Sequence, residues 1–139
     1  MSGLREELRR KAREWAQFAD EDLSLARHAL DMGCDCPYRL VAYHAQQCAE
    51  KYLKAYLVLK AVDFPRTHKI SLLVELCMES ACWAHELKDA EQLTVYGIVT
   101  RYPGGDRAVT EAEARRAIAL ATEVAQKVRE ALADAGLFE

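Results

Sequence analysis

The sequence of 139 residues lacks any apolar run that approaches the roughly 18 residues needed to span a bilayer. Its N-terminal stretch, residues 2–15, is too highly charged to be a signal peptide. The net charge of -3 leaves no overall basic surface for nucleic acid, so such a contact would need a local patch. We therefore expect a cytoplasmic protein without membrane contacts.

A regular pattern of cysteines is missing as well. The chain has five cysteines, an odd number at irregular spacing, which does not fit a disulfide framework and agrees with reduced thiols. Cys34 and Cys36 would need Cys82 and His85 to complete a zinc site. Neither pair has the Cys-x-x-Cys spacing of structural zinc sites, so we predict no metal and no cofactor. Three thiols are instead expected to be small buried hydrophobic groups: Cys48, Cys77 and Cys82.

Familiar catalytic arrangements are absent too. The sequence shows no Ser-His-Asp set, no paired carboxylates and no HExxH motif, which excludes most classes of hydrolase. It has no GxxxxGK[ST] phosphate-binding loop. Internal repeats and low-complexity tracts are also missing, and nothing marks a domain boundary.

What the sequence does contain is helical periodicity almost from end to end, and no segment alternates like a strand. Hydrophobic residues make up 51% and charged residues 29%, which is typical of a folded domain. We predict an all-α fold, an antiparallel bundle of four to five helices in a single domain that covers residues 1–139. The predicted helices cover residues 7–31, 38–61, 71–81, 85–96 and 110–136, with a loop over residues 96–110.

Local signals mark the ends of these helices. Gly33 follows the first helix in a position that often ends a helix, and Pro65 ends the second unit. The last helix has the clearest start, because Thr110 is followed three residues later by Glu113 in a capping box. Apolar residues at helical spacing should turn the first helix toward the core: Trp15, Phe18, Ala19, Leu23, Ala26 and Leu30.

The second predicted helix carries a polar face opposite its apolar stripe. In projection at about 100° per residue, this face collects Arg39, Tyr43, Gln46, Gln47, Glu50, Lys51 and Lys54. A solvated surface would account for most of them, with Glu50 and Lys54 as a helical i,i+4 ion pair. The two adjacent glutamines also suit an interface or the edge of a ligand, because amides both donate and accept hydrogen bonds.

Arg39 and His44 on the same helix form an Arg-x4-His motif. Histidine serves as general base and acid near neutral pH, and arginine stabilises charge on a phosphate, which together suffice for metal-independent RNA cleavage through the 2′-hydroxyl. Five residues along a helix place the two side-chain directions about 140° apart. A working pair would therefore need a frayed first turn or a second subunit. Otherwise Arg39 is a solvated residue and His44 lies at the edge of the core.

Arg66, His68 and Lys69 follow Pro65 at the start of the next predicted helix. Free backbone amides at that start, with Thr67 as a cap, would form an anion site. Ordinary turn chemistry is the alternative.

A second loop contains Arg101 and Tyr102 before Pro103. An arginine beside an aromatic ring could hold a phosphate and stack on a base. The alternative is a polar connection between helices.

Several segments stand in the chain in a characteristic order: Trp15 with 19-ADxDL-23, the core 43-YHAQQxAEKxLKA-55, 65-PxTH-68, 101-RYP-103 and 110-TxxEA-114. This pattern resembles the HEPN domain family over nearly the whole chain. The resemblance implies a helical bundle that forms a homodimer and works with a small nucleotidyltransferase encoded beside it, in toxin–antitoxin-like modules. Catalytic members are metal-independent ribonucleases, in which two Arg-x4–6-His motifs meet across the dimer.

The chain departs from the catalytic pattern at two positions. Leu40 follows the motif arginine where active members often have a polar residue, and Gln46 stands where some members have tyrosine. The favoured hypothesis is thus a non-catalytic module that binds a nucleotidyltransferase and nucleotide or RNA. Its binding residues would be Gln46, Gln47, Lys51, Lys54, Arg66, His68, Lys69, Arg101 and Tyr102. The alternative is a metal-independent endoribonuclease toxin that uses Arg39 and His44 across a homodimer.

Overall fold

The computed structural model describes residues 2–99 and 108–138, and all regular elements in these ranges are helices, as predicted. Two of them are 3₁₀-helices, labelled η. The order along the chain is α1 (Ser2–Ala29), η1 (Leu30–Asp35), α2 (Tyr38–Leu59), α3 (Ile70–Met78), η2 (Cys82–Leu93), α4 (Thr94–Val99) and α5 (Glu111–Asp134). Arg101 and Tyr102, predicted to bind RNA, lie outside the described residues.

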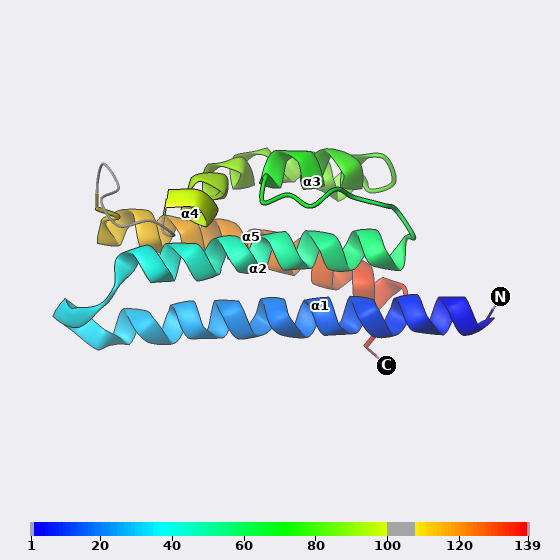
Figure 1. The fold of residues 1–139 in the computed structure, drawn as a ribbon, viewed down its shortest axis with the longest axis horizontal. Helices are drawn as coiled ribbons and strands as arrows, with labels where there is room; N and C mark the ends of the chain where they lie inside the picture. Colours follow the sequence, from blue (N-terminus) through cyan, green and yellow to red (C-terminus); the bar gives the residue numbers. More distant parts are fainter. Residues whose placement is uncertain (1, 100–107, 139) are drawn as a thin grey trace.

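The helices form two layers (Figure 1). Helices α1, α2 and α5 pack side by side, and α3, η2 and α4 lie over α2 and α5. Helix α1 runs opposite to α2, whereas α5 runs in the same direction as α2, because the second layer carries the chain back before α5 begins. Helix α2 is therefore the central element and packs against all the other α-helices of the bundle.

Small side chains let α1 and α2 approach each other closely. Alanines at positions 12, 16 and 19 of α1, and at 42, 45 and 49 of α2, are buried. Close approach increases the contact between the helices and leaves little room for water. Phe18, in contrast, does not turn toward the core as predicted, and it is 49% exposed. It precedes Ala19 by one residue, which places it about 100° around the helix from that buried alanine.

The ends of the long helices follow the local signals in part. The capping box of Thr110 and Glu113 is present at the start of α5, and Gly33 adopts a left-handed φ of 68° at a kink within η1. Helix α2 ends earlier than predicted, at Leu59. There Ala61 adopts a φ of 57° and the amide of Val62 donates to the carbonyl of Leu57 at 2.9 Å, an arrangement that closes a helix well before Pro65.

The middle of the chain differs more from the prediction. Residues 82–93 form a 3₁₀-helix that starts earlier than the helix predicted over residues 85–96, and α4 then continues into the predicted loop. Leu87 has non-helical φ and ψ inside η2. These short elements take their shape from packing over α2 and α5, and isolated short helices have little stability of their own.

The cysteines are free thiols. Cys48 and Cys77 are buried, and burial raises the pKa of both thiols, whereas Cys82 is exposed and corrects the prediction that it lies in the core. Within the described residues no group of histidine, cysteine or acidic side chains could hold a metal ion. No helix among them is both long and apolar enough to cross a membrane.

The capping box makes the stability of α5 testable. We expect Thr110→Ala to lower the free energy of unfolding by about 1 kcal/mol, because the amide of Glu113 loses its acceptor. Urea unfolding measures this difference. Ser24→Ala, which removes an exposed hydroxyl inside α1, is the control and should change stability by less than about 0.5 kcal/mol. Equal effects of the two substitutions would contradict the role of the cap.

Candidate functional site

The polar residues of α2 belong to two clusters built around different carboxylates. We call the first the Glu50 cluster; it consists of Gln46, Glu50, Lys54 and His68. The second, the Asp22 cluster, consists of Asp22, His44 and Lys51. In each cluster one carboxylate binds a histidine through one oxygen and a lysine through the other. The two differ in burial, and this difference determines what each can do.

The Glu50 cluster lies largely inside the protein, although the side chain of His68 is 42% exposed. Relative exposure is 0% for Gln46, 4% for Glu50 and 8% for Lys54. The Glu50 carboxylate accepts hydrogen bonds from Lys54 Nζ at 2.9 Å and Gln46 Nε2 at 2.9 Å, and its Oε1 lies 2.8 Å from His68 Nδ1. Burial alone would raise the pKa of Glu50, but these hydrogen bonds outweigh it and hold the pKa below its ordinary value. The predicted i,i+4 ion pair is present, but not on a solvated face.

Aromatic rings enclose the cation of this cluster. Lys54 Nζ lies 5.5 Å from the ring centroid of Trp15 on α1 and 5.7 Å from that of Phe64 in the segment after α2. Favourable cation–π contacts of this kind help a lysine to remain charged away from water. Lys54 therefore ties together α1, α2 and residues 60–69, and it does not face a ligand as predicted.

Gln46 also has no free edge for a ligand. Its Nε2 donates to Glu50 and, at 3.3 Å, to the carbonyl of His68, while its Oε1 accepts from Gln47 Nε2 at 2.7 Å. A Cβ added at Gly97 of α4 would lie 2.9 Å from Gln46 Cδ, so the backbone of α4 closes over the amide. Gln46 thus holds α4 and the segment before α3 against α2.

The Asp22 cluster lies at the seam between α1 and α2 and reaches the surface. Asp22 Oδ1 lies 2.8 Å from His44 Nδ1, and Asp22 Oδ2 accepts from Lys51 Nζ at 2.6 Å. The side chain of His44 is 26% exposed, and its ring packs edge-on against Tyr43 at 5.2 Å. Among the described residues no group bonds to Nε2 of His44. Lys51, predicted to bind nucleotide, is engaged by Asp22.

Arg39 and His44 are not brought together within one chain. Arg39 is exposed in the first turn of α2 and forms no ion pair with residues 2–99 or 108–138. Both residues lie within regular α-helix, so the angle of about 140° between their directions persists. A frayed first turn, which would let them converge, is absent.

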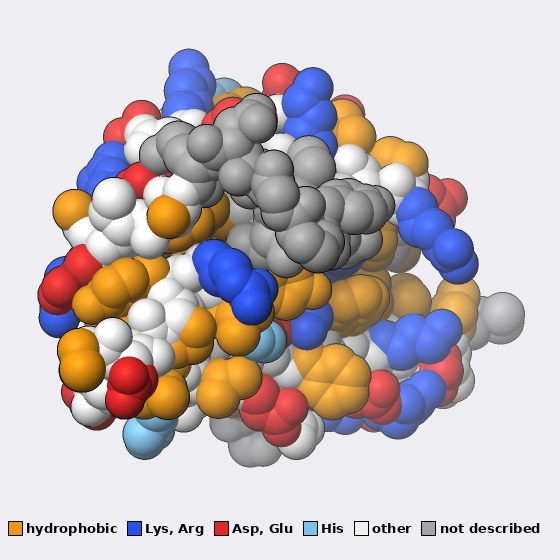
Figure 2. Space-filling view, turned by 60° about the vertical axis from the view of Figure 1, so that its left-hand side comes forward, with side chains coloured by type: hydrophobic (Ala, Val, Ile, Leu, Met, Phe, Trp, Pro, Cys, Tyr) orange, Lys and Arg blue, Asp and Glu red, His pale blue; other side chains and the backbone are white. Residues whose placement is uncertain are grey.

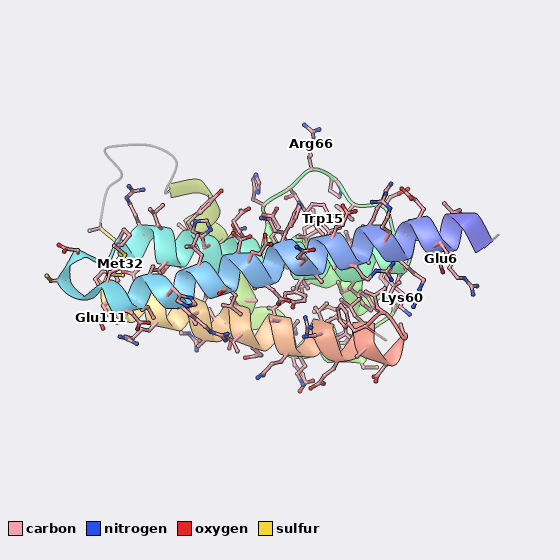
Figure 3. The ribbon with its side chains drawn as sticks, turned by 90° about the horizontal axis from the view of Figure 1, so that it is seen from below. Glu6, Trp15, Met32, Lys60, Arg66 and Glu111 are labelled. Atoms are coloured by element: carbon pink, nitrogen blue, oxygen red, sulfur yellow. The ribbon has the colours of Figure 1, made fainter. Side chains whose placement is uncertain are left out.

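The turn before α3 is only partly as predicted. Thr67 Oγ1 accepts from the amide of Lys69 at 3.0 Å, which is ordinary turn chemistry. The first amides of α3 are already occupied: Ile70 donates to Thr94 Oγ1 at 3.0 Å and Ser71 to Glu91 Oε2 at 2.5 Å. A carboxylate of the same chain thus fills the predicted anion site. Arg66 remains exposed and points away from the bundle (Figure 3).

Sequence reasoning missed Asp22 as a member of the site. The signal was present, because Asp20 and Asp22 flank the apolar stripe of α1 that contains Ala19 and Leu23. Carboxylates beside such a stripe face the neighbouring helices. Asp22 indeed meets α2, and Asp20 binds Tyr52 of α2 and Arg129 of α5.

Comparison with known proteins agrees with this architecture. The sequence profile of the HEPN domain matches residues 12–131, so the chain belongs to the HEPN domain family. The crystal structure of TT1696 from Thermus thermophilus is similar with a TM-score of 0.70 and 28% identity, covering 86% of this chain and 97% of that one. The crystal structure of ST0689, an archaeal HEPN homologue, has a TM-score of 0.68 at 24% identity and covers 88% and 98% of the two chains.

One relative has a functional name. The "Putative toxin MJ1304" of Methanocaldococcus jannaschii is 32% identical over 101 residues, which cover 66% of this chain and 63% of that protein. The match therefore spans less than two thirds of the relative's length. The family assignment rests on the domain profile.

The Glu50 cluster predicts a distinct loss of stability. Glu50→Gln should lower the free energy of unfolding at pH 7 by about 3–5 kcal/mol, because Lys54 is left buried without its counter-charge. Adding Lys54→Met should recover part of this loss. In the wild type, the lowered pKa means that Glu50 stabilises the fold above the ordinary carboxyl range, and this contribution disappears as pH falls through the folded-state pKa.

Urea unfolding between pH 7 and pH 3 tests both statements. The stability of Glu50→Gln should fall less steeply toward acid than that of the wild type. Glu111→Gln is the control, because Glu111 also has a pKa lowered by hydrogen bonds from Arg115 and Tyr38 but is exposed, and its loss should change little. A Glu50→Gln protein as stable as this control would show that the cluster does not stabilise the fold.

Proposed function

We propose that this chain is the HEPN component of a toxin–antitoxin-like pair, which binds a small nucleotidyltransferase and RNA or nucleotide on the surface formed by the first turn of α2 and by residues 66–69. The name of the archaeal relative supports the toxin–antitoxin setting. The single observation that carries RNA binding is a set of exposed cations without counter-charges among the described residues. Three of them border this side of the molecule: Arg39, Arg66 and Lys69.

The arrangement of these cations suits a backbone ligand. Arg39 and Gln46 are seven residues apart and so lie on one face of α2, about 10 Å from each other along the helix axis. The segment that contains Arg66 and Lys69 crosses α2 at Gln46, where the carbonyl of His68 accepts from the amide. None of the three cations forms an ion pair with the described residues, whereas Arg10, Arg115 and Lys127 elsewhere on the surface are paired with acids. Phosphates would supply the missing counter-charge.

The buried polar residues support this surface from below. Because the Glu50 cluster holds residues 60–69 against α2, Arg66 and Lys69 are presented on a fixed backbone and do not lose as much conformational entropy on binding. In this proposal Gln46, Lys54 and His68 act through the fold and make no contact with the ligand. Gln47, which is half-buried, bonds to Gln46, whereas Lys51, also half-buried, lies at the seam with α1 and binds Asp22.

Charge removal tests the surface. In the triple variant Arg39→Ala, Arg66→Ala, Lys69→Ala, the affinity for a single-stranded RNA oligonucleotide should fall at least tenfold. The slope of log affinity against log salt should fall by about 2, since each phosphate contact on a single strand contributes about 0.7. Fluorescence anisotropy over a salt series measures both quantities.

The matched control removes three cations that already have acidic partners: Arg10→Ala, Arg115→Ala and Lys127→Ala. Both triple variants lose the same formal charge, so a general electrostatic effect would weaken binding equally in the two. Equal losses, or unchanged binding in the first variant, would exclude this face as the RNA site.

A second function, metal-independent endoribonuclease, is favoured by the Asp22 cluster. His44 is partly exposed and held by a carboxylate, an arrangement suited to a general base. Because Arg39 of the same chain diverges from it, the site would form between two copies. Hydrophobic residues exposed near this end of the bundle support such a contact: Leu25, Met32 and Leu40. Figure 2 shows hydrophobic side chains exposed on this face of the molecule, interspersed with separate Lys and Arg side chains.

The reaction follows from these two residues. His44 of one copy accepts the proton of an RNA 2′-hydroxyl, and the 2′-oxygen attacks the adjacent phosphorus. The bond from phosphorus to the 5′-oxygen breaks, and the 5′-oxygen takes a proton from water. Arg39 of the second copy balances the charge that develops on the phosphoryl oxygens. The products are a 2′,3′-cyclic phosphate and a 5′-hydroxyl.

Mixing inactive variants tests this second function. RNA should be cleaved in EDTA by the wild-type protein and by His85→Ala, which alters an exposed histidine elsewhere, but not by Arg39→Ala or His44→Ala. An equal mixture of the two inactive proteins should regain about a quarter of the activity, because half the exchanged dimers contain one of two intact sites. Intact RNA with every protein would leave the binding function alone.

A further inference from the structure

We propose that Asp22 is the positioning residue of His44, and that Lys51 fixes which oxygen of Asp22 the histidine meets. This inference rests on the second proposed function, because it assigns Nε2 of His44 as the atom that accepts the substrate proton. The geometry of the Asp22 cluster determines the tautomer of the imidazole ring in the resting protein, that is, which of the two ring nitrogens of His44 carries the hydrogen.

The donors and acceptors of the Asp22 cluster fix the direction of its hydrogen bonds. An ionised carboxylate only accepts hydrogen bonds, so at 2.8 Å from Asp22 Oδ1 the Nδ1 of His44 must donate. In the neutral ring Nδ1 then holds the hydrogen and Nε2 holds the lone pair. No described group bonds to Nε2, and the side chain is 26% exposed. The nitrogen with the lone pair is therefore the one available to a substrate hydroxyl.

Lys51 completes the arrangement from the other side. Its ammonium group, which only donates, lies 2.6 Å from Asp22 Oδ2 and balances the negative charge of Asp22 at the seam. Asp22 thus has one oxygen for each partner and cannot turn without breaking a contact.

The Glu50 cluster combines the same groups in a different way. There a carboxylate again joins a histidine and a lysine, with 2.8 Å from Glu50 Oε1 to His68 Nδ1 and 2.9 Å from Oε2 to Lys54 Nζ. That cluster has a third donor, Gln46, and its carboxylate and lysine are buried, although the side chain of His68 is 42% exposed. The Asp22 cluster has no third donor among the described residues, so the Asp22 carboxylate is shared by His44 and Lys51 alone.

Replacing Asp22 by asparagine gives a sharp test, because Lys51 should select the orientation of the new amide. Lys51 only donates, so it must face the amide oxygen, which leaves the NH₂ group toward His44. Nδ1 of His44 must then accept, and the hydrogen moves to Nε2. Asp22→Asn should therefore invert the tautomer, whereas the double variant Asp22→Asn, Lys51→Met frees the amide to turn and should return part of the population to the original one.

The measurement is long-range ¹H–¹⁵N NMR of the full-length protein labelled in histidine, at a pH where imidazole is neutral, with His44→Gln to assign the signals. We expect hydrogen on Nδ1 in the wild type and in Lys51→Met, on Nε2 in Asp22→Asn, and a larger share on Nδ1 in the double variant than in Asp22→Asn. Asp20→Asn, two residues away on another seam, is the matched control and should leave the His44 signals unchanged. A wild-type ring with hydrogen on Nε2, or an Asp22→Asn ring that keeps it on Nδ1, would overturn the proposal.

Cleavage assays separate this proposal from the function on which it rests. Asp22→Asn should lower the rate of RNA cleavage about a hundredfold or more, and the double variant should recover part of the loss. If the wild type cleaves no RNA but the tautomers follow the expected pattern, the ribonuclease function fails and the positioning of His44 by Asp22 stands. If Asp22→Asn inverts the tautomer and cleavage is unchanged, the positioning role in catalysis is wrong. Should Asp22→Asn not fold, the wild-type and Lys51→Met spectra still decide the tautomer.

Discussion

The carboxylate of Glu50 is the contact on which the arrangement of the bundle depends. It lies on the central helix and binds Lys54 of the same helix, His68 of the segment before α3, and Gln46, which α4 covers. A charge buried to this degree is tolerated only when its hydrogen bonds are complete, and no buried side-chain polar atom of the described residues lacks a partner. The second layer of helices is thus attached to α2 through polar contacts as well as through apolar packing.

The burial of the Glu50 cluster divides the polar side chains of α2 into those that hold the fold together and those that remain exposed. Gln46 and Lys54, which the sequence predicts as ligand contacts, are buried and bond to Glu50. The side chains that remain accessible are at the seam with α1 and at the edges of the face, where His44 and Arg39 lie. A helix that is buried on most sides can carry a site only along such a seam, because elsewhere its neighbours exclude substrate.

The sequence predicted the features that arise from local chemistry. The capping box at Thr110 follows from short-range hydrogen bonding and is present, and Gly33, expected just after the first helix, lies at a kink within η1 with a positive φ. The burial of Glu50 could not be predicted in this way, because a helical projection assumes one apolar stripe and one wet face. Helix α2 has neighbours on several sides, and only the tertiary packing shows that its polar residues are enclosed. Likewise, the conformation of η2 depends more on its packing over α2 and α5 than on the spacing of its own apolar residues.

Gln46 links the fold to the question of catalysis. Some catalytic members that the sequence resembles carry tyrosine at this position, two residues after the motif histidine. Here the position is fully buried, bonds to Glu50 and His68, and lies against Gly97, so a side chain at this place serves the attachment of α4 and not a substrate. The absence of tyrosine therefore does not by itself remove the means to activate a hydroxyl. Any such chemistry in this chain depends on His44 and on the carboxylate of Asp22 beside it. Substitution of Asp22 should therefore impair a ribonuclease, whereas it should have little effect on a protein that only binds RNA.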